Sequence, residues 1–204
     1  MTALPMPWTE LAALLVFASA MAFTPGPNTT LAAALAANHG LRHAMRFVVA
    51  VPFGWGLLLL GCALGLGALL QAAPVLAGLL KWAGLAYMLW LAWKLARSAS
   101  LGEADPRRFD MSFAKGVALQ FVNLKAWMNA LMISAGWITV AEPFWPRLAL
   151  VLPLMMAYGL ASNFTYALVG SALRGWLAHG ARLRWFNRSL ALVLMATAAW
   201  MAVL

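Results

Sequence analysis

Two short polar segments interrupt otherwise apolar stretches of this chain. The first is Thr24-Pro25-Gly26-Pro27-Asn28, and the second runs from Gln120 to Ala126 and contains Asn123 and Lys125. Proline has no N–H and its ring clashes with the preceding helical turn, so carbonyl groups near Pro25 and Pro27 must lose their intrahelical partners. In a membrane, broken backbone and buried polar groups are tolerated only where neighbouring protein or a water-filled cavity satisfies them. The two segments therefore predict a binding site.

A helix that resumes after Pro27 would present its positive N-terminal end to a ligand. Asn28 and Thr29 are candidate caps of that helix, and Gly26 tolerates backbone conformations that are closed to other residues. Such a helix end suits a carboxylate. The alternative interpretation is a structural kink in which Asn28 caps the helix and binds no ligand.

Lys125 is the most unusual charge in the sequence. It lies about twelve residues into its apolar stretch, roughly 18 Å at about 1.5 Å per residue, which is deep for a side chain that must reach water. No acidic residue lies at comparable depth in the sequence. Lys125 would pair with carbonyls at the Pro25 break, with Asn28 or with a substrate carboxylate. The alternative is a shallower stretch from which Lys125 reaches a headgroup.

A further set of polar residues lies in the fifth apolar stretch. Its side chains can hydrogen-bond but do not titrate near neutral pH, and they are Ser162, Asn163, Thr165 and Tyr166. They line a cavity or join helices, and both interpretations stay open. The predicted substrate site consists of Pro25, Gly26, Pro27, Asn28, Asn123, Lys125 and Asn163.

The sequence predicts no metal site, no cofactor and no enzyme activity. His39 and His43 have a spacing that suits a metal, but two imidazoles without a nearby carboxylate or thiol more commonly form an interfacial collar. The single cysteine, Cys62, excludes a thiol–disulfide carrier, which needs two thiols. No combination of histidine, acid and thiol at depth suits an intramembrane enzyme.

The elements that position these residues follow from composition. The chain has 204 residues, of which 65% are hydrophobic and 9% charged, more apolar surface than a soluble core of this size can bury. Stretches that are apolar on every side, such as Leu57 to Leu60, favour helices over barrel strands. The predicted fold class is an all-α membrane protein with six transmembrane helices, at residues 8–37, 44–70, 75–96, 113–138, 147–173 and 185–204.

Basic residues mark alternate connections. Of the 14 Lys and Arg residues, two follow the first stretch, five lie between the third and fourth, and four lie between the fifth and sixth. By the positive-inside rule these connections face the cytoplasm, so both termini would be periplasmic in a multi-pass protein of the bacterial inner membrane. The net charge of +9 fits this topology, with the lipid bilayer as partner, more simply than it fits nucleic-acid binding.

The hydrophilic loop 98–112 divides one membrane domain, residues 1–204, into halves at about 8–97 and 113–204. With three spans each, the halves enter the membrane from opposite sides, which is the geometry of an inverted 3+3 repeat with broken helices 1 and 4. Small residues at Gly54, Gly61 and Gly65 give the second span a smooth face. That face serves internal packing or a homodimer.

Several segments resemble the LysE/RhtB family of amino-acid exporters in order and spacing. They are Thr24 to Asn28, Asn38 to Ala44, Gly65 to Leu70, Leu80 to Leu95, and Asn123 to Ala126, which is similar to the family's Asn-Pro-Lys-Ala element with leucine in place of proline. The resemblance implies a secondary transporter that exports amino acids or related small zwitterions and is driven by the proton gradient. The alternative is a non-transporting membrane interaction or assembly protein, which would not require Lys125 or Asn28.

Overall fold

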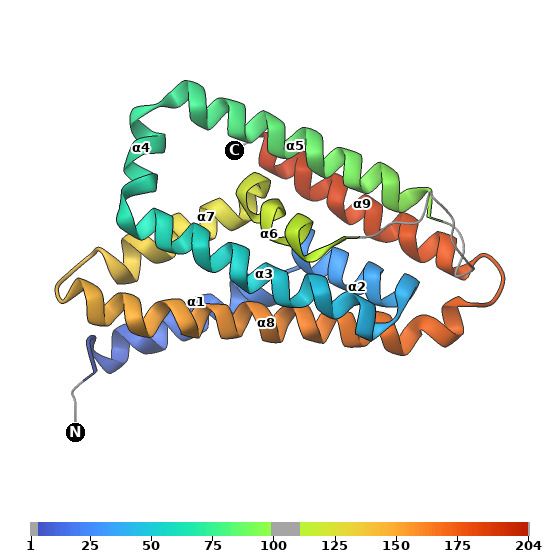
Figure 1. The fold of residues 1–204 in the computed structure, drawn as a ribbon, viewed down its shortest axis with the longest axis horizontal. Coiled ribbons are helices and arrows are strands. Elements are labelled where there is room, and N and C mark those ends of the chain that lie inside the picture. Colours follow the sequence, from blue (N-terminus) through green and yellow to red (C-terminus); the bar gives the residue numbers. More distant parts are fainter. Residues whose placement is uncertain (1–3, 99–110, 204) are drawn as a thin grey trace.

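The computed structural model describes residues 4–98 and 111–203, which form helices that run mostly along one axis (Figure 1). The elements are α1 (Trp8–Phe23), α2 (Pro27–His39), α3 (Leu41–Gly61), η1 (Cys62–Leu66), α4 (Gly67–Ala72), α5 (Pro74–Ala96), α6 (Phe113–Val122), α7 (Leu124–Ile133), η2 (Ser134–Ile138), α8 (Phe144–Leu177) and α9 (Arg182–Ala202). The predicted all-α class is confirmed. The predicted stretches begin and end within four residues of these elements.

Both polar segments interrupt helices. Helices α1 and α2 meet at an angle of 49°, and α6 ends at Val122, one residue before the extended backbone of Asn123. The helices among the described residues that are individually long and apolar enough to span a membrane are Leu41–Leu70, Pro74–Ala96 and Phe144–Leu177. The bent pair α1–α2 makes a fourth span if it is counted as one. The six-span count and the 3+3 repeat stay predictions.

Helix α2 forms the centre of the bundle. Almost every residue from Pro27 to Asn38 is buried, and α2 packs along α8 and α3. Close approach to α8 depends on Gly170, where an added Cβ would lie 2.2 Å from the Ala33 carbonyl oxygen. The first turn of α2, which carries Asn28, is therefore held rigidly in the interior.

The glycines of α3 and η1 have different roles. An added Cβ at Gly54 would lie 2.6 Å from the Val117 carbonyl oxygen of α6, so this glycine serves internal packing. Gly65 has a φ of 112°, in the left-handed region that favours glycine, and α4 turns away from the bundle axis after it (Figure 1). A homodimer stays a prediction.

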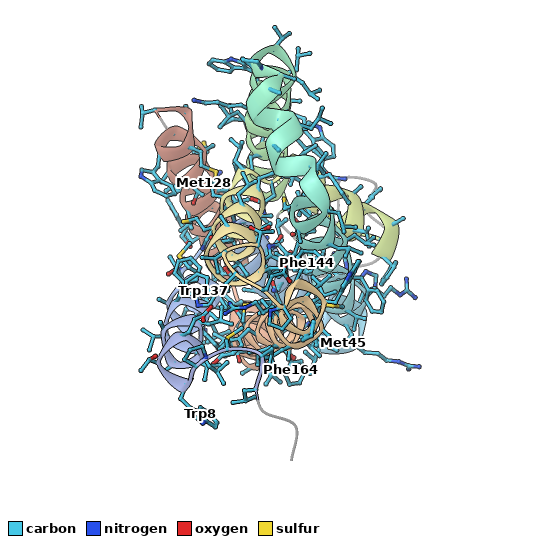
Figure 2. All side chains as sticks on the ribbon, turned by 90° about the vertical axis from the view of Figure 1, so that its left-hand side faces the viewer. Trp8, Met45, Met128, Trp137, Phe144 and Phe164 are labelled. Carbon is cyan, nitrogen blue, oxygen red and sulfur yellow. The ribbon has the colours of Figure 1, made fainter. Side chains whose placement is uncertain are left out.

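The connections rich in basic residues gather at one end of the bundle. The α2–α3 and α8–α9 turns lie at the right of Figure 1, together with the end of α5, whereas the N-terminus lies at the left. Large side chains cover the outside. Those near helix ends that are more than half exposed include Trp8, Trp145, Trp176 and Trp185, as expected for aromatic residues at a membrane interface. Seen along the bundle, Trp8 projects from the outer face of α1 (Figure 2).

Candidate functional site

Side chains from α7 and α8 bind four carbonyl groups at the break after α1. The bonds are Ser162 Oγ to the Ala22 oxygen, Tyr166 Oη to the Phe23 oxygen at 2.9 Å, and Lys125 Nζ to the Thr24 and Pro25 oxygens at 2.8 and 3.4 Å. The prediction that Lys125 pairs with carbonyls at this break is confirmed. Ser162 and Tyr166 join helices here, and Ser162 also lines the cavity described below, so this set of polar residues does both.

Thr29, not Asn28, caps the start of α2. Its Oγ1 accepts the Gly26 N–H at 3.0 Å and donates to the Gly26 oxygen at 3.1 Å. Gly26 does not use the conformational freedom of glycine, because its φ of −174° is extended backbone that any residue adopts. Gly26 instead makes room for Lys125, since an added Cβ would lie 3.0 Å from Lys125 Cδ and 3.1 Å from Nζ.

The second break forms without proline. Asn123 has a φ of −91° and a ψ of 101°, and its carbonyl oxygen accepts the N–H groups of Ala126 and Trp127, so that α7 starts afresh after it. The Phe121 carbonyl freed by the break accepts Trp127 Nε1 at 2.9 Å. Helices α2 and α7 run in opposite directions from the two breaks (Figure 1). Their positive N-terminal ends therefore meet in the interior.

Asn28 connects the two breaks through Gln120. Asn28 Nδ2 donates to Gln120 Oε1 at 2.8 Å, and Gln120 Nε2 donates back to Asn28 Oδ1 at 3.1 Å. Asn123 Nδ2 also reaches Asn28 Oδ1, at 3.5 Å. The sequence prediction did not include Gln120 in the site, because no local signal shows which amide an asparagine 92 residues away will meet.

A small cavity of about 90 Å³ lies between the breaks. Of the predicted site residues, the cavity is lined by Gly26, Pro27, Asn28, Asn123, Lys125 and Asn163. Pro25 does not line it and contributes only its carbonyl, which binds Lys125. Asn129 also lines the cavity and is absent from the prediction. Among the described residues, Lys125 is the only charged one in the lining, so the cavity suits an anionic group.

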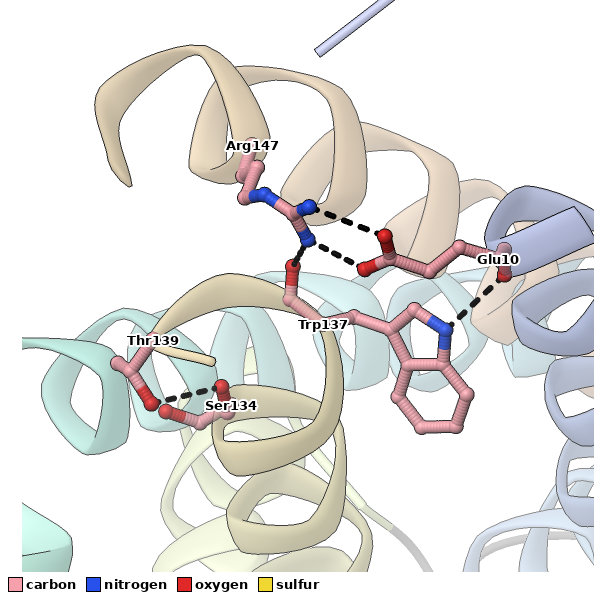
Figure 3. Close-up of polar contacts among 5 residues, drawn as sticks. All are labelled: Glu10, Ser134, Trp137, Thr139 and Arg147. Atoms are coloured by element: carbon pink, nitrogen blue, oxygen red, sulfur yellow. Dashed lines mark hydrogen bonds and ion pairs between the residues drawn. The ribbon is translucent and has the colours of Figure 1, made fainter. Parts of the chain in front are cut away.

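Glu10 and Arg147 form an ion pair that the sequence prediction missed. The fifth predicted stretch begins at Arg147, which lies in the first turn of α8 with its side chain 5% exposed. Its guanidinium binds both carboxylate oxygens of Glu10, and Arg147 Nη1 also donates to the Trp137 oxygen at 3.2 Å. Trp137 Nε1 donates to the Glu10 carbonyl oxygen at 3.1 Å (Figure 3). The sequence contained a signal for this pair, because Glu10 and Arg147 have opposite charges and each lies near the start of its predicted stretch, the first and the fifth.

At the basic end, Asn38 of α2 and Asn187 of α9 form a second reciprocal amide pair. Asn38 Nδ2 donates to Asn187 Oδ1 at 2.9 Å, and Asn187 Nδ2 donates to Asn38 Oδ1 at 3.0 Å. Ser98 Oγ and the Ser98 carbonyl oxygen bind the same two amides. The neighbouring rings of His39 and His43 stack with centroids 4.7 Å apart. Within residues 4–98 and 111–203, no group of three or more His, Cys, Asp and Glu residues is arranged to hold a metal.

Comparison with known proteins identifies one matching family and several similar proteins. Residues 19–203 match the family described as LysE type translocator. The cysteine/O-acetylserine efflux protein of Klebsiella pneumoniae subsp. pneumoniae is 32% identical over 185 residues, which cover 89% of this chain and 93% of that protein. The cysteine/O-acetylserine efflux protein of Escherichia coli K12 is 32% identical over 162 residues, which cover 79% of this chain and 83% of that protein. No solved structure matches the chain significantly.

Proposed function

Because this chain belongs to the LysE type translocator family, we propose that it exports amino acids through the cavity between its two helix breaks. The chain is a multi-pass membrane transporter and not an enzyme. The efflux proteins similar to it make cysteine and O-acetylserine the first candidate substrates. Lys125 carries this proposal, because it places a cation in the cavity at a depth where charged side chains mark substrate pathways.

Lys125 has a hydrogen-bond donor to offer a substrate. A lysine ammonium has three N–H groups, and the two carbonyl oxygens at the first break, of Thr24 and Pro25, engage two of them. By helix geometry, the N–H groups of Asn28 and Thr29 in the first turn of α2 also lack an intrahelical acceptor. A carboxylate in the cavity would meet these donors and the positive ends of α2 and α7.

Transport would follow from alternating access between two inverted halves. The support is that each half begins with a helix broken in its interior, at Pro25 and at Asn123. The basic connections at one end of the bundle support the orientation proposed for a bacterial inner membrane, with that end in the cytoplasm and both termini in the periplasm. We further propose that the proton gradient drives export.

Efflux from proteoliposomes tests this function. Vesicles that contain the purified protein are loaded with labelled cysteine, kept reduced, or with labelled O-acetylserine, and efflux is followed with and without a pH gradient. We expect efflux well above that of protein-free vesicles and faster efflux into an acidic medium. Efflux of neither substrate, nor of any other amino acid in a panel of twenty, above protein-free vesicles would overturn the proposal. Efflux that ignores the pH gradient would overturn proton coupling alone.

A further inference from the structure

Three residues that line the cavity each have a buried amide oxygen with no hydrogen-bond partner among the described residues. These oxygens are the Oδ1 atoms of Asn123, Asn129 and Asn163. Asn123 and Asn163 are only 2% and 4% exposed. A buried acceptor without a donor costs about 1–3 kcal/mol, and such atoms are rare in folded proteins. Three of them around one small cavity indicate that a ligand brings the donors.

Hydrogen bonds to backbone carbonyls set the orientation of the amide groups of Gln120 and Asn163. Gln120 Nε2 donates to the Gly116 oxygen at 3.0 Å, which turns Gln120 Oε1 toward Asn28 Nδ2. Asn28 Oδ1 then accepts Asn123 Nδ2. Asn123 Oδ1 ends this series of hydrogen bonds and has no partner within residues 4–98 and 111–203. In the same way, Asn163 Nδ2 donates to the Gly159 oxygen at 2.8 Å, which leaves Asn163 Oδ1 as an acceptor.

The cavity therefore has two chemically different poles. Donors come from Lys125 and the first turns of α2 and α7, whereas acceptors come from the asparagine oxygens. The acceptors are neutral dipoles, and within the described residues the lining contains no acidic side chain. A second cationic group on a substrate would thus face Lys125 with no anion to balance it, and such like-charge repulsion is strong where water is scarce.

We propose that the oxygens of Asn123, Asn129 and Asn163 bind the α-ammonium group of the substrate while its carboxylate lies at Lys125, so that the cavity selects small amino acids with uncharged side chains. This assignment rests on the proposed export function. An α-ammonium group supplies three N–H donors, and it is separated from the carboxylate by a single carbon. Both poles of an amino acid therefore fit within a cavity of about 90 Å³, far below the roughly 300–1,000 Å³ of sites for drug-sized ligands.

Competition against labelled cysteine efflux tests the substrate assignment. One matched pair is cysteine and 3-mercaptopropionate, which is the same molecule without the ammonium group. The other is homoserine and 2,4-diaminobutyrate, which have equal length and differ in side-chain charge. We expect the first member of each pair to compete at least about 10-fold better than the second. 3-Mercaptopropionate leaves the buried asparagine oxygens without donors, and 2,4-diaminobutyrate adds a charge that no anion balances. Equal competition within both pairs would overturn this inference and leave export standing, whereas absence of any efflux would overturn both.

Substitution of the acceptors separates ligand binding from a structural role. Asn163→Leu is expected to weaken competition by cysteine about 10-fold and to leave competition by 3-mercaptopropionate unchanged, because only cysteine has an ammonium group to lose a partner. Asn129→Leu serves the same purpose if the first variant does not fold. Asn129→Asp is expected to admit 2,4-diaminobutyrate. The control is Thr165→Val on α8, whose exposed hydroxyl binds its own helix. Equal weakening of both competitors would show that the asparagines act only on structure.

Discussion

Helix α2 enters two buried amide pairs that look alike and differ in one respect. At the basic end, Asn38 and Asn187 exchange hydrogen bonds, and Ser98 binds both amides. In the interior, Asn28 and Gln120 exchange hydrogen bonds in the same way. In the first network, which we call closed, both asparagine oxygens accept hydrogen bonds. The second network continues to Asn123, whose Oδ1 has no partner among the described residues.

The difference separates polar groups that hold the bundle together from polar groups that await a ligand. A fully satisfied buried network rigidifies the fold, whereas a partly satisfied one is destabilising unless something completes it. The closed pair joins α2 to α9. The open pair lies beside the cavity that contains Lys125. We therefore expect substitutions in closed clusters to reduce stability and substitutions around the cavity to reduce transport.

The largest expected effect concerns the ion pair of Glu10 and Arg147, which joins α1 to α8 away from the cavity. Arg147→Met leaves a carboxylate without its cation, and breaking such a pair reduces stability by about 3 kcal/mol. Unfolding of the purified protein in detergent measures the change. The double variant Glu10→Leu with Arg147→Met removes both charges, and we expect it to recover most of the loss. Wild-type stability in the single variant would show that this ion pair does not hold the bundle together.

The next largest effect concerns Lys125. Lys125→Ala should lower efflux about 100-fold, equivalent to roughly 2.7 kcal/mol, because it removes the charge that binds the carboxylate. Its matched control is Lys115→Ala, an exposed lysine of α6 that lies outside the cavity. We expect the control to transport at the wild-type rate and both variants to remain folded. Unchanged efflux in Lys125→Ala would remove this residue from the substrate site.

A smaller effect is expected at the closed amide pair. Asn187→Leu leaves the Asn38 amide without its reciprocal partner, which should reduce the free energy of unfolding by about 2 kcal/mol. Transport per folded molecule should stay within about twofold of wild type, since Asn187 is absent from the cavity lining. Measuring unfolding and efflux on the same preparation separates the two readouts. A selective loss of transport would show that the closed pair also takes part in the transport cycle.

Local sequence features predicted the breaks and the helices, but they could not predict most partners. Pro25 and Pro27 announce a break by their missing N–H groups, and a lysine deep in an apolar stretch requires a partner wherever it lies. The Asn28 to Gln120 pair depends on how α6 lies beside α2, which no local pattern encodes. The pairing of Arg147 with Glu10 was missed because a charge near a helix end fits a connection as well as a buried pair.

The smallest expected effect tests why Gly26 is glycine. Its extended backbone accepts alanine without strain, but the added Cβ would lie 3.0 Å from Lys125 Cδ and 3.1 Å from Nζ. Gly26→Ala should therefore displace the ammonium group by a few tenths of an ångström and weaken substrate binding about fivefold, with stability nearly unchanged. The control is Gly78→Ala in α5, where an added Cβ meets no atom within 4 Å. Competition by cysteine measures the change. A stability loss without a change in binding would mean that Gly26 serves the backbone of the break rather than the position of Lys125.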